Sequence, residues 1–237
     1  MELTQDMLAE IFAGRPKRFR LLDAGVIRAG WTVGARLLEI GCNTGDAAAH
    51  LAEARLEVTA ADIDEGRVLR ARAAHADAPG CRFIKADAAA LPFEGGSFDG
   101  VYSEAAFSVL PDKAAALSEY FRLLRPGGRV LINDFALRRS VPADGRAAVA
   151  AVPCFAGALT MAEYGLLFRR GGFAERCGRE EFYEFASIFA NLASALGVKP
   201  RGLGGALAEG FGGERAPGES FFEKAGLSYC QMIFEKA

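Results

Sequence analysis

The sequence has no long apolar run. None of its 237 residues falls in a stretch approaching the roughly 18 consecutive apolar residues that a membrane helix needs. The first ten residues include acidic side chains where a secretory signal would be basic and then apolar. We therefore expect a cytoplasmic protein with no membrane partner.

Cysteine patterns and an excess of one charge are also missing. The five cysteines are an odd number and include no C-x-x-C pair, which argues against a disulfide framework and a zinc site. Twenty-eight basic residues against thirty acidic ones give a net charge of −2, without a basic block. Proteins that bind nucleic acid normally carry such a block, so we expect no nucleic-acid partner. From the cysteine pattern we expect no metal.

Apolar residues are plentiful at 51%, which is enough for a sizeable core, and the length suits one domain over residues 1–237. From residue 36 to residue 134 short β-type runs alternate with helical segments. The expected strands are 36–40, 56–60, 81–86, 98–102 and 129–134, and the expected helices are 44–55, 65–76 and 112–124. This alternation predicts an α/β, doubly wound, mainly parallel sheet whose sites lie at the carboxyl ends of its strands.

The flanking segments are less regular. Residues 1–30 indicate two helices, a cap that lies either across the top of the sheet or on its edge. Helices are expected near 143–151 and 160–170, and strands at 173–179 and 227–234, which leaves 180–226 as an insertion between the last two strands. His50 and His75 fall on outer helices, where solvated side chains are expected.

The insertion has two different halves. Its first half places an apolar stripe at helical spacing, formed by Phe182, Phe185, Phe189, Leu192 and Leu196. This stripe favours core packing over a lid or the seam of a homodimer. The second half, 202–218, carries seven glycines without a phosphate-loop lysine, which is typical of a flexible surface loop.

A glycine-containing turn, residues 39–45, joins the first strand to the first helix of the alternating region. Glycines there let the backbone turn tightly and let a ligand approach its N–H groups. Asp62 follows about twenty residues later at the end of the second strand, where a carboxylate can accept hydrogen bonds from both hydroxyls of a ribose. The pairing indicates an adenosine-type ligand.

Four ordered motifs in residues 36–134 resemble class I S-adenosylmethionine (SAM) dependent methyltransferases, in the small-molecule group that includes the ubiquinone-biosynthesis C-methyltransferases. They are the glycine loop, residues 61–64, Asp87 ahead of 91–93, and residues 124–132. The resemblance implies a seven-stranded sheet with an antiparallel last strand at 227–234. It also implies SAM as cofactor, S-adenosylhomocysteine as product and a small-molecule acceptor.

The resemblance assigns residues to the methionine end of SAM. Gly41, Asn43 and Gly45 would contact the methionine part. Glu39 would orient the loop and the amino group, and Ser103, just past the fourth strand, would face the same end. Asn43 departs from the glycine usual in the family, but Asn tolerates left-handed dihedral angles, so binding should survive.

The adenosine end is assigned in the same way. Asp62 would hold the ribose, and Ile63 would pack on the adenine face. Asp87 would accept from the adenine amino group, while the backbone N–H of Ala88 would donate to the ring.

Two other interpretations keep a nucleotide-type ligand. A dehydrogenase would need G-x-G-x-x-G, which residues 41–46 do not supply, and it leaves the motifs at 91–93 and 126–128 unexplained. A methyltransferase-like module that binds SAM without catalysis stays open from the sequence alone.

Methyl transfer from a sulfonium needs mainly alignment and exclusion of water, so a general base is optional. The candidates are Tyr102, Ser103 and Glu104 after the fourth strand and Asp134 after the fifth, because these strand ends surround the methyl group. Glu104 is the best single candidate for a base or for holding a cationic acceptor. A surface or helix-capping carboxylate is the alternative.

Residues 152–159 are similar to the Cys-x-Gly-Gly-Ala-Leu stretch of arsenite methyltransferases, in which that cysteine is an arsenic ligand. Cys154 matches it, but the family's other arsenic-binding cysteines have no clear counterpart. We expect Cys154 to lie on a segment that covers the acceptor site, either as a ligand for a metalloid or as an ordinary buried thiol.

Overall fold

A computed structural model describes residues 3–140, 152–199, 202–210 and 226–237. In these residues eight strands form one sheet, in the order β3-β2-β1-β4-β5-β8-β7, with β6 beside β5. The strands are β1 (Arg36–Ile40), β2 (Glu57–Asp62), β3 (Cys81–Lys85), β4 (Phe98–Glu104), β5 (Leu124–Leu137), β6 (Leu159–Thr160), β7 (Phe173–Glu180) and β8 (Leu227–Lys236).

The strand directions confirm the predicted mainly parallel sheet. β1 pairs in parallel with β2 and β4, β2 with β3, and β5 with β4 and β6. The last strand, β8, runs antiparallel between β5 and β7. The two-residue β6 is an addition that the sequence did not indicate. Ile40 pairs with both Ala61 and Ser103, so the carboxyl ends of β1, β2 and β4 lie level at one edge.

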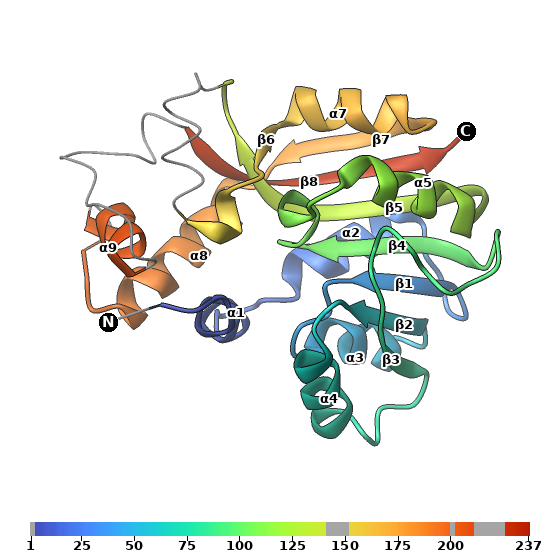
Figure 1. The fold of residues 1–237 in the computed structure, drawn as a ribbon, viewed down its shortest axis with the longest axis horizontal. Coiled ribbons are helices and arrows are strands. Elements are labelled where there is room, and N and C mark those ends of the chain that lie inside the picture. The colour runs from blue at the N-terminus through green and yellow to red at the C-terminus, as the bar shows by residue number, and fades with distance from the viewer. Residues whose placement is uncertain (1–2, 141–151, 200–201, 211–225) are drawn as a thin grey trace.

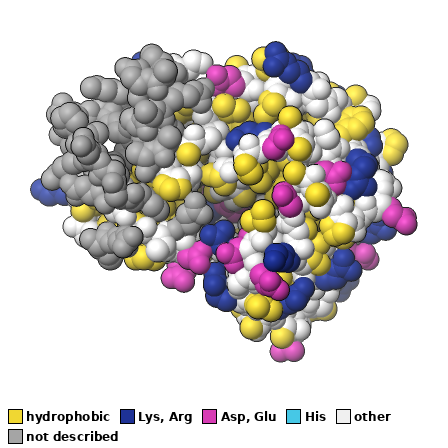
Figure 2. Space-filling view, viewed as in Figure 1, with side chains coloured by type: hydrophobic (Ala, Val, Ile, Leu, Met, Phe, Trp, Pro, Cys, Tyr) yellow, Lys and Arg dark blue, Asp and Glu magenta, His cyan; other side chains and the backbone are white. Residues whose placement is uncertain are grey.

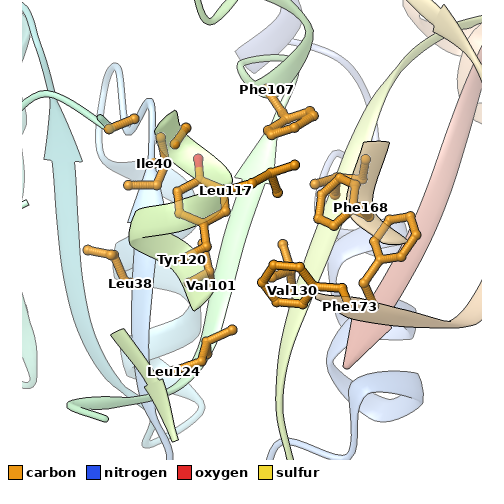
Figure 3. Close-up of a cluster of buried hydrophobic side chains, with 14 of the residues drawn as sticks. Leu38, Ile40, Val101, Phe107, Leu117, Tyr120, Leu124, Val130, Phe168 and Phe173 are labelled. Atoms are coloured by element: carbon orange, nitrogen blue, oxygen red, sulfur yellow. The ribbon is translucent and has the colours of Figure 1, made fainter. Parts of the chain in front are cut away.

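Helices cover both faces of the sheet, as a doubly wound fold requires. Leu38, Val101 and Val130 point toward α5 (Lys113–Leu123) and α7 (Met161–Arg170). Figure 3 shows this cluster, with Tyr120 and Phe168 contributed by those helices. The alternate strand residues, such as Leu37, face α2 (Arg20–Ala29), α3 (Asp46–Glu53) and α4 (Glu65–Ala74).

A third apolar cluster lies beyond the carboxyl ends of the parallel strands, where α1 (Gln5–Ala13), α8 (Phe182–Ala195) and α9 (Leu203–Gly210) gather (Figure 1). The apolar stripe of α8 contributes Phe185, Phe189 and Leu192 to it, which supports the core-packing interpretation. Phe182, at the start of the stripe, is 59% exposed. Helices α1 and α2 agree with the two expected in residues 1–30.

The prediction of a loop over 202–218 is wrong for its first part. Residues Leu203–Gly210 form α9, because Leu203 and Leu207, one helical turn apart, are both buried and their burial outweighs the low helix propensity of the glycines. The helix expected at 143–151 and the rest of the glycine-rich stretch lie outside the described residues. Within the described part of the chain, no helix has the length and apolar character to cross a membrane.

Candidate SAM-type cofactor and acceptor site

The glycine loop between β1 and α3 forms one wall of a cavity at the carboxyl edge of the sheet. Gly41 and Gly45 adopt φ of +78° and +80°, and Asn43 is left-handed at +46°, as expected of an Asn in this place. A Cβ at Gly41 would lie 2.5 Å from the Cβ of Ala106, and one at Gly45 would lie 2.6 Å from the Phe83 ring. Both glycines are therefore needed for backbone angle and for space.

Carboxyl groups line the cavity beside this loop. Asp62, at the end of β2, accepts hydrogen bonds from the backbone N–H of Asn43 (3.1 Å) and of Asp64 (3.0 Å), which fixes its side chain against the loop. Glu39 is buried, and among the described residues its Oε2 has no hydrogen-bond partner. Burial, together with the nearby Glu104 and Asp62 carboxylates, raises the pKa of Glu39 to about 8.

Glu104, at the end of β4, sits in a dense hydrogen-bond network. Its Oε1 accepts from Nη2 of Arg15 at 2.5 Å, and its Oε2 accepts from the hydroxyl of Tyr102 at 2.7 Å. The Tyr229 hydroxyl lies 3.4 Å from Oε1. Both oxygens of Glu104 are already engaged by protein donors, so this geometry favours an orienting role for Glu104 over the role of general base.

The predicted site residues divide into two groups. The cavity brings together Glu39, Gly41, Asn43, Asp62, Glu104 and Cys154. The other group lies off its wall and consists of Gly45, Ile63, Asp87, Ala88 and Ser103.

Each residue of the second group has a definite setting. The Ile63 side chain is 63% exposed just past β2, and Ala88 is buried. The carboxylate of Asp87 accepts from the backbone N–H of Ala89 at 2.9 Å. Ser103 is buried within β4, and among the described residues its hydroxyl has no hydrogen-bond partner.

Three arginines that the sequence analysis did not single out also line the cavity, namely Arg15, Arg18 and Arg67. Arg18 pairs with Asp46 at 3.1 Å, and Arg67 donates to Asp6 of α1 at 2.7 and 2.9 Å. The basic cluster at 15–18 was a visible signal. Its partners were not, because they lie elsewhere in the chain.

Cys154, in the short 3-10 helix η2 (Pro153–Phe155), lines the cavity as expected. Burial raises the pKa of its thiol above the ordinary value, so the sulfur is a neutral thiol at physiological pH. In the described ranges no group of three or more His, Cys, Asp or Glu side chains is placed to hold a metal ion. This environment gives no support to a thiolate site for arsenic.

Asp134, the other candidate carboxylate, supports the site from behind. It is buried in β5 and accepts from the backbone N–H of Ser108 (2.8 Å) and of Phe135 (2.7 Å). Burial raises the pKa of Asp134 to about 6. Its bond to Ser108 anchors the 3-10 helix η1 (Phe107–Val109), whose Val109 faces the cavity.

The two histidines are not simply solvated, which corrects the expectation for them. The ring of His50 stacks on Phe19 with centroids 4.0 Å apart. His75 is half-buried and its Nε2 lies 3.1 Å from the backbone oxygen of Thr44, so this ring packs behind the glycine loop. His50 thus contacts the N-terminal segment, and His75, just past the end of α4, contacts the glycine loop.

The sequence is similar to those of known methyltransferases. Residues 38–132 match the family described as "Methyltransferase domain". A demethylmenaquinone methyltransferase of Beutenbergia cavernae is 34% identical over 134 residues, 56% of this chain and 52% of that protein. A 27-O-demethylrifamycin SV methyltransferase of Amycolatopsis mediterranei is 41% identical over 108 residues, 44% of this chain and 40% of that protein. The chain thus spans about half the length of the curated relatives that it matches.

Solved structures extend the likeness of the fold to nearly the whole chain. Phosphoethanolamine N-methyltransferase 2 of Haemonchus contortus, solved in complex with S-adenosyl-L-methionine, superposes with a TM-score of 0.75 at 19% identity. The match covers 98% of this chain and 57% of the other. The fold seen here is therefore the one used by that enzyme.

Proposed function

We propose that this chain is a class I SAM-dependent methyltransferase, similar to the ubiquinone and menaquinone methyltransferases, and that it transfers a methyl group from SAM to a small-molecule acceptor. One observation carries the proposal most directly. Asp62 is locked by two backbone N–H groups beside a loop with two glycines that leave no room for a side chain.

The residues present fit SAM, which carries a sulfonium and an ammonium group. The unpartnered oxygen of buried Glu39 can accept from the ammonium, and Asp62 can accept from the ribose hydroxyls. The backbone of Gly41 and Asn43 would border the methionine part. Bound SAM supplies an electrophilic methyl group, and the protein has to align the acceptor and exclude water.

The adenine would lie outside the cavity wall, over the edge formed by Ile63, Asp87 and Ala88. The exposed Ile63 side chain offers an apolar surface for a ring, and the Asp87 carboxylate stands at the end of β3. Ser103 lies in β4 beside Ile40, the last residue of β1, directly before the glycine loop. Gly45 starts α3 in a left-handed conformation and positions the loop without lining the cavity.

The acceptor is proposed to be a small molecule rather than a nucleic acid. On the face of the described residues shown in Figure 2, basic and acidic side chains are interspersed. A duplex or single strand would call for a stripe of basic residues. An arsenite acceptor is disfavoured, because Cys154 is a neutral thiol and no group of three or more possible ligands lies together among the residues that the structure describes.

An acceptor panel tests the proposal. Purified protein and SAM are incubated with metabolites of varied class, and release of S-adenosylhomocysteine is measured, with Gly41→Val as the inactive control. Turnover with at least one acceptor, absent from the control, is the expected result. Tight SAM binding with no turnover across a broad panel would favour a non-catalytic SAM-binding module, and no SAM binding would refute the family's chemistry for this chain.

A further inference from the structure

Beyond the glycine loop, the cavity has a second wall with a different character. Six apolar or aromatic residues form it, and we refer to them as the acceptor wall: Phe12, Val109, Phe135, Cys154, Ile188 and Tyr229. They come from α1, η1, β5, η2, α8 and β8. The ring of Phe135 packs against the rings of Phe12 and Tyr229, with ring centroids 5.8 Å and 5.1 Å apart, respectively.

The carboxylate of Glu104 lines the same cavity and lies next to this wall, with its Oε1 3.4 Å from the hydroxyl of Tyr229. Aromatic rings around a carboxylate commonly bind quaternary or protonated amines, through cation–π attraction and charge. Taken without its neighbour Arg15, this set would therefore indicate a cationic acceptor.

Arg15 makes the site unsuitable for a cationic acceptor. Its side chain is only 6% exposed, and it makes four hydrogen bonds: to Glu104 (2.5 Å), to Glu184 of α8 (2.7 Å), and to the backbone oxygens of Phe12 (2.8 Å) and Arg18 (3.3 Å). A guanidinium stays charged at every physiological pH. An ammonium ion entering the cavity would therefore meet a buried cation already bound to the carboxylate it needs.

An anionic acceptor is no better served. Most of the N–H groups of Arg15 are already used, and the carboxylates of Asp62 and Glu104 line the same cavity. Beside the acceptor wall, the pairing of Arg15 with Glu104 thus leaves no free charge for either kind of ion, while the apolar rings favour an uncharged molecule.

We propose that Arg15 is a specificity-determining residue: by neutralising Glu104 it makes the acceptor wall a site for an uncharged, ring-containing acceptor and excludes ammonium acceptors. The inference rests on the proposed function. Arg15, Glu184 and Tyr229 all lie outside residues 38–132, so the device belongs to the parts of this chain that the family match does not reach.

The test uses two probes of nearly equal shape and different charge, 4-tert-butylphenol and 4-hydroxy-N,N,N-trimethylanilinium. Each is titrated into protein saturated with S-adenosylhomocysteine, and the ratio of the two dissociation constants is measured. The variant is Arg15→Met combined with Glu184→Gln, which avoids leaving the buried Glu184 carboxylate with only its 3.5 Å contact to Arg20. Glu184→Gln alone is the matched control, because it keeps Arg15 beside Glu104.

Wild-type protein and the control should bind the phenol at least about tenfold more tightly than the anilinium, and the double variant should lower that ratio by at least about tenfold. A wild-type preference for the anilinium, a ratio unchanged in the double variant, or no binding of either probe would overturn the proposal. A failure of S-adenosylhomocysteine itself to bind would instead count against the proposed function. A change in folding alone would lower both affinities together and leave the ratio where it was.

Discussion

At the scale of single residues, the site contains one carboxyl group, that of Glu39, whose burial is unfavourable in its charged form. Glu39 is the second-last residue of β1 and is buried, with neighbouring carboxylates and, among the described residues, no hydrogen-bond partner for its Oε2. A cofactor with a positive charge would compensate this burial, whereas the free protein does so by keeping the group protonated. The buried Glu39 carboxyl group thus favours binding of a cation but lowers the stability of the free protein.

This arrangement predicts a pH dependence of stability. The pKa of Glu39 is about 8 in the folded protein against 4.5 for an ordinary Glu, so the folded state binds the proton more tightly than the unfolded state. Stability contributed by the protonated form is full below pH 4.5 and declines between there and pH 8. Glu39→Gln cannot ionise and should lack this decline.

Chemical denaturation at pH 5 and at pH 8 measures the effect. The unfolding free energy of Glu39→Gln relative to wild type should rise between the two pH values by at least about 1.4 kcal/mol, the equivalent of one pKa unit. Asp134, with a pKa of about 6, adds a decline common to both proteins and cancels in the difference. Parallel pH profiles for the two proteins would refute this account of Glu39.

Cys154 provides a second prediction for a single residue. A neutral thiol that packs in an apolar wall is replaced by a hydroxyl of similar size in Cys154→Ser, so the SAM affinity should stay within about twofold and stability should fall by about 1 kcal/mol. Calorimetry with SAM and thermal unfolding measure the two quantities. Turnover that depends on arsenite and disappears in Cys154→Ser would contradict the role given to this thiol.

At the scale of elements, the segment that carries Cys154 is anchored by the start of α7. The Thr160 hydroxyl accepts from the backbone N–H of Glu163 at 3.1 Å, and Glu163 Oε2 accepts from the backbone N–H of Thr160 at 2.8 Å. This reciprocal pair is a capping box. It fixes the start of α7 and with it the end of the segment that carries η2 and β6. The start of α7 therefore helps to shape the cavity.

Thr160→Ala should lower the unfolding free energy by about 1 kcal/mol, because one backbone N–H at the helix start loses its acceptor. Ser118→Ala on α5 is the control. Its exposed hydroxyl donates to the backbone oxygen of Ala114 and caps nothing. Equal unfolding free energies for the two variants would show that the capping box does not anchor α7.

Elements were predictable from sequence where local signals agree. The strand 36–40 and the helix starting after Thr160 were expected at nearly the bounds observed, because period, capping residue and punctuation point the same way. Helix α9 was missed, since its glycines indicate a loop and only tertiary burial of Leu203 and Leu207 makes it helical. The two-residue β6 has too little sequence to carry any pattern.

At the scale of the whole molecule, the cavity lies where three parts of the chain meet. The sheet supplies the glycine loop and Asp62, the N-terminal segment supplies Arg15, and α8 supplies Ile188 and the partner carboxylate Glu184. The proximity of the glycine loop to Asp62 was predictable, because the two follow successive parallel strands. The Arg15 network joins residues 89 and 169 positions apart, and no local pattern in the sequence reports such contacts.

The central claim is that this cavity binds SAM through the glycine loop and Asp62. Its most direct test is calorimetric titration of SAM into wild-type protein and Asp62→Ala, with Asp77→Ala, which removes an exposed carboxylate, as control. We predict measurable binding to wild type and control, and a loss of roughly 1.5 to 3 kcal/mol in Asp62→Ala, because the ribose hydroxyls lose a charged acceptor. Equal affinity in wild type and Asp62→Ala, or tighter binding of NAD than of SAM, would contradict the account.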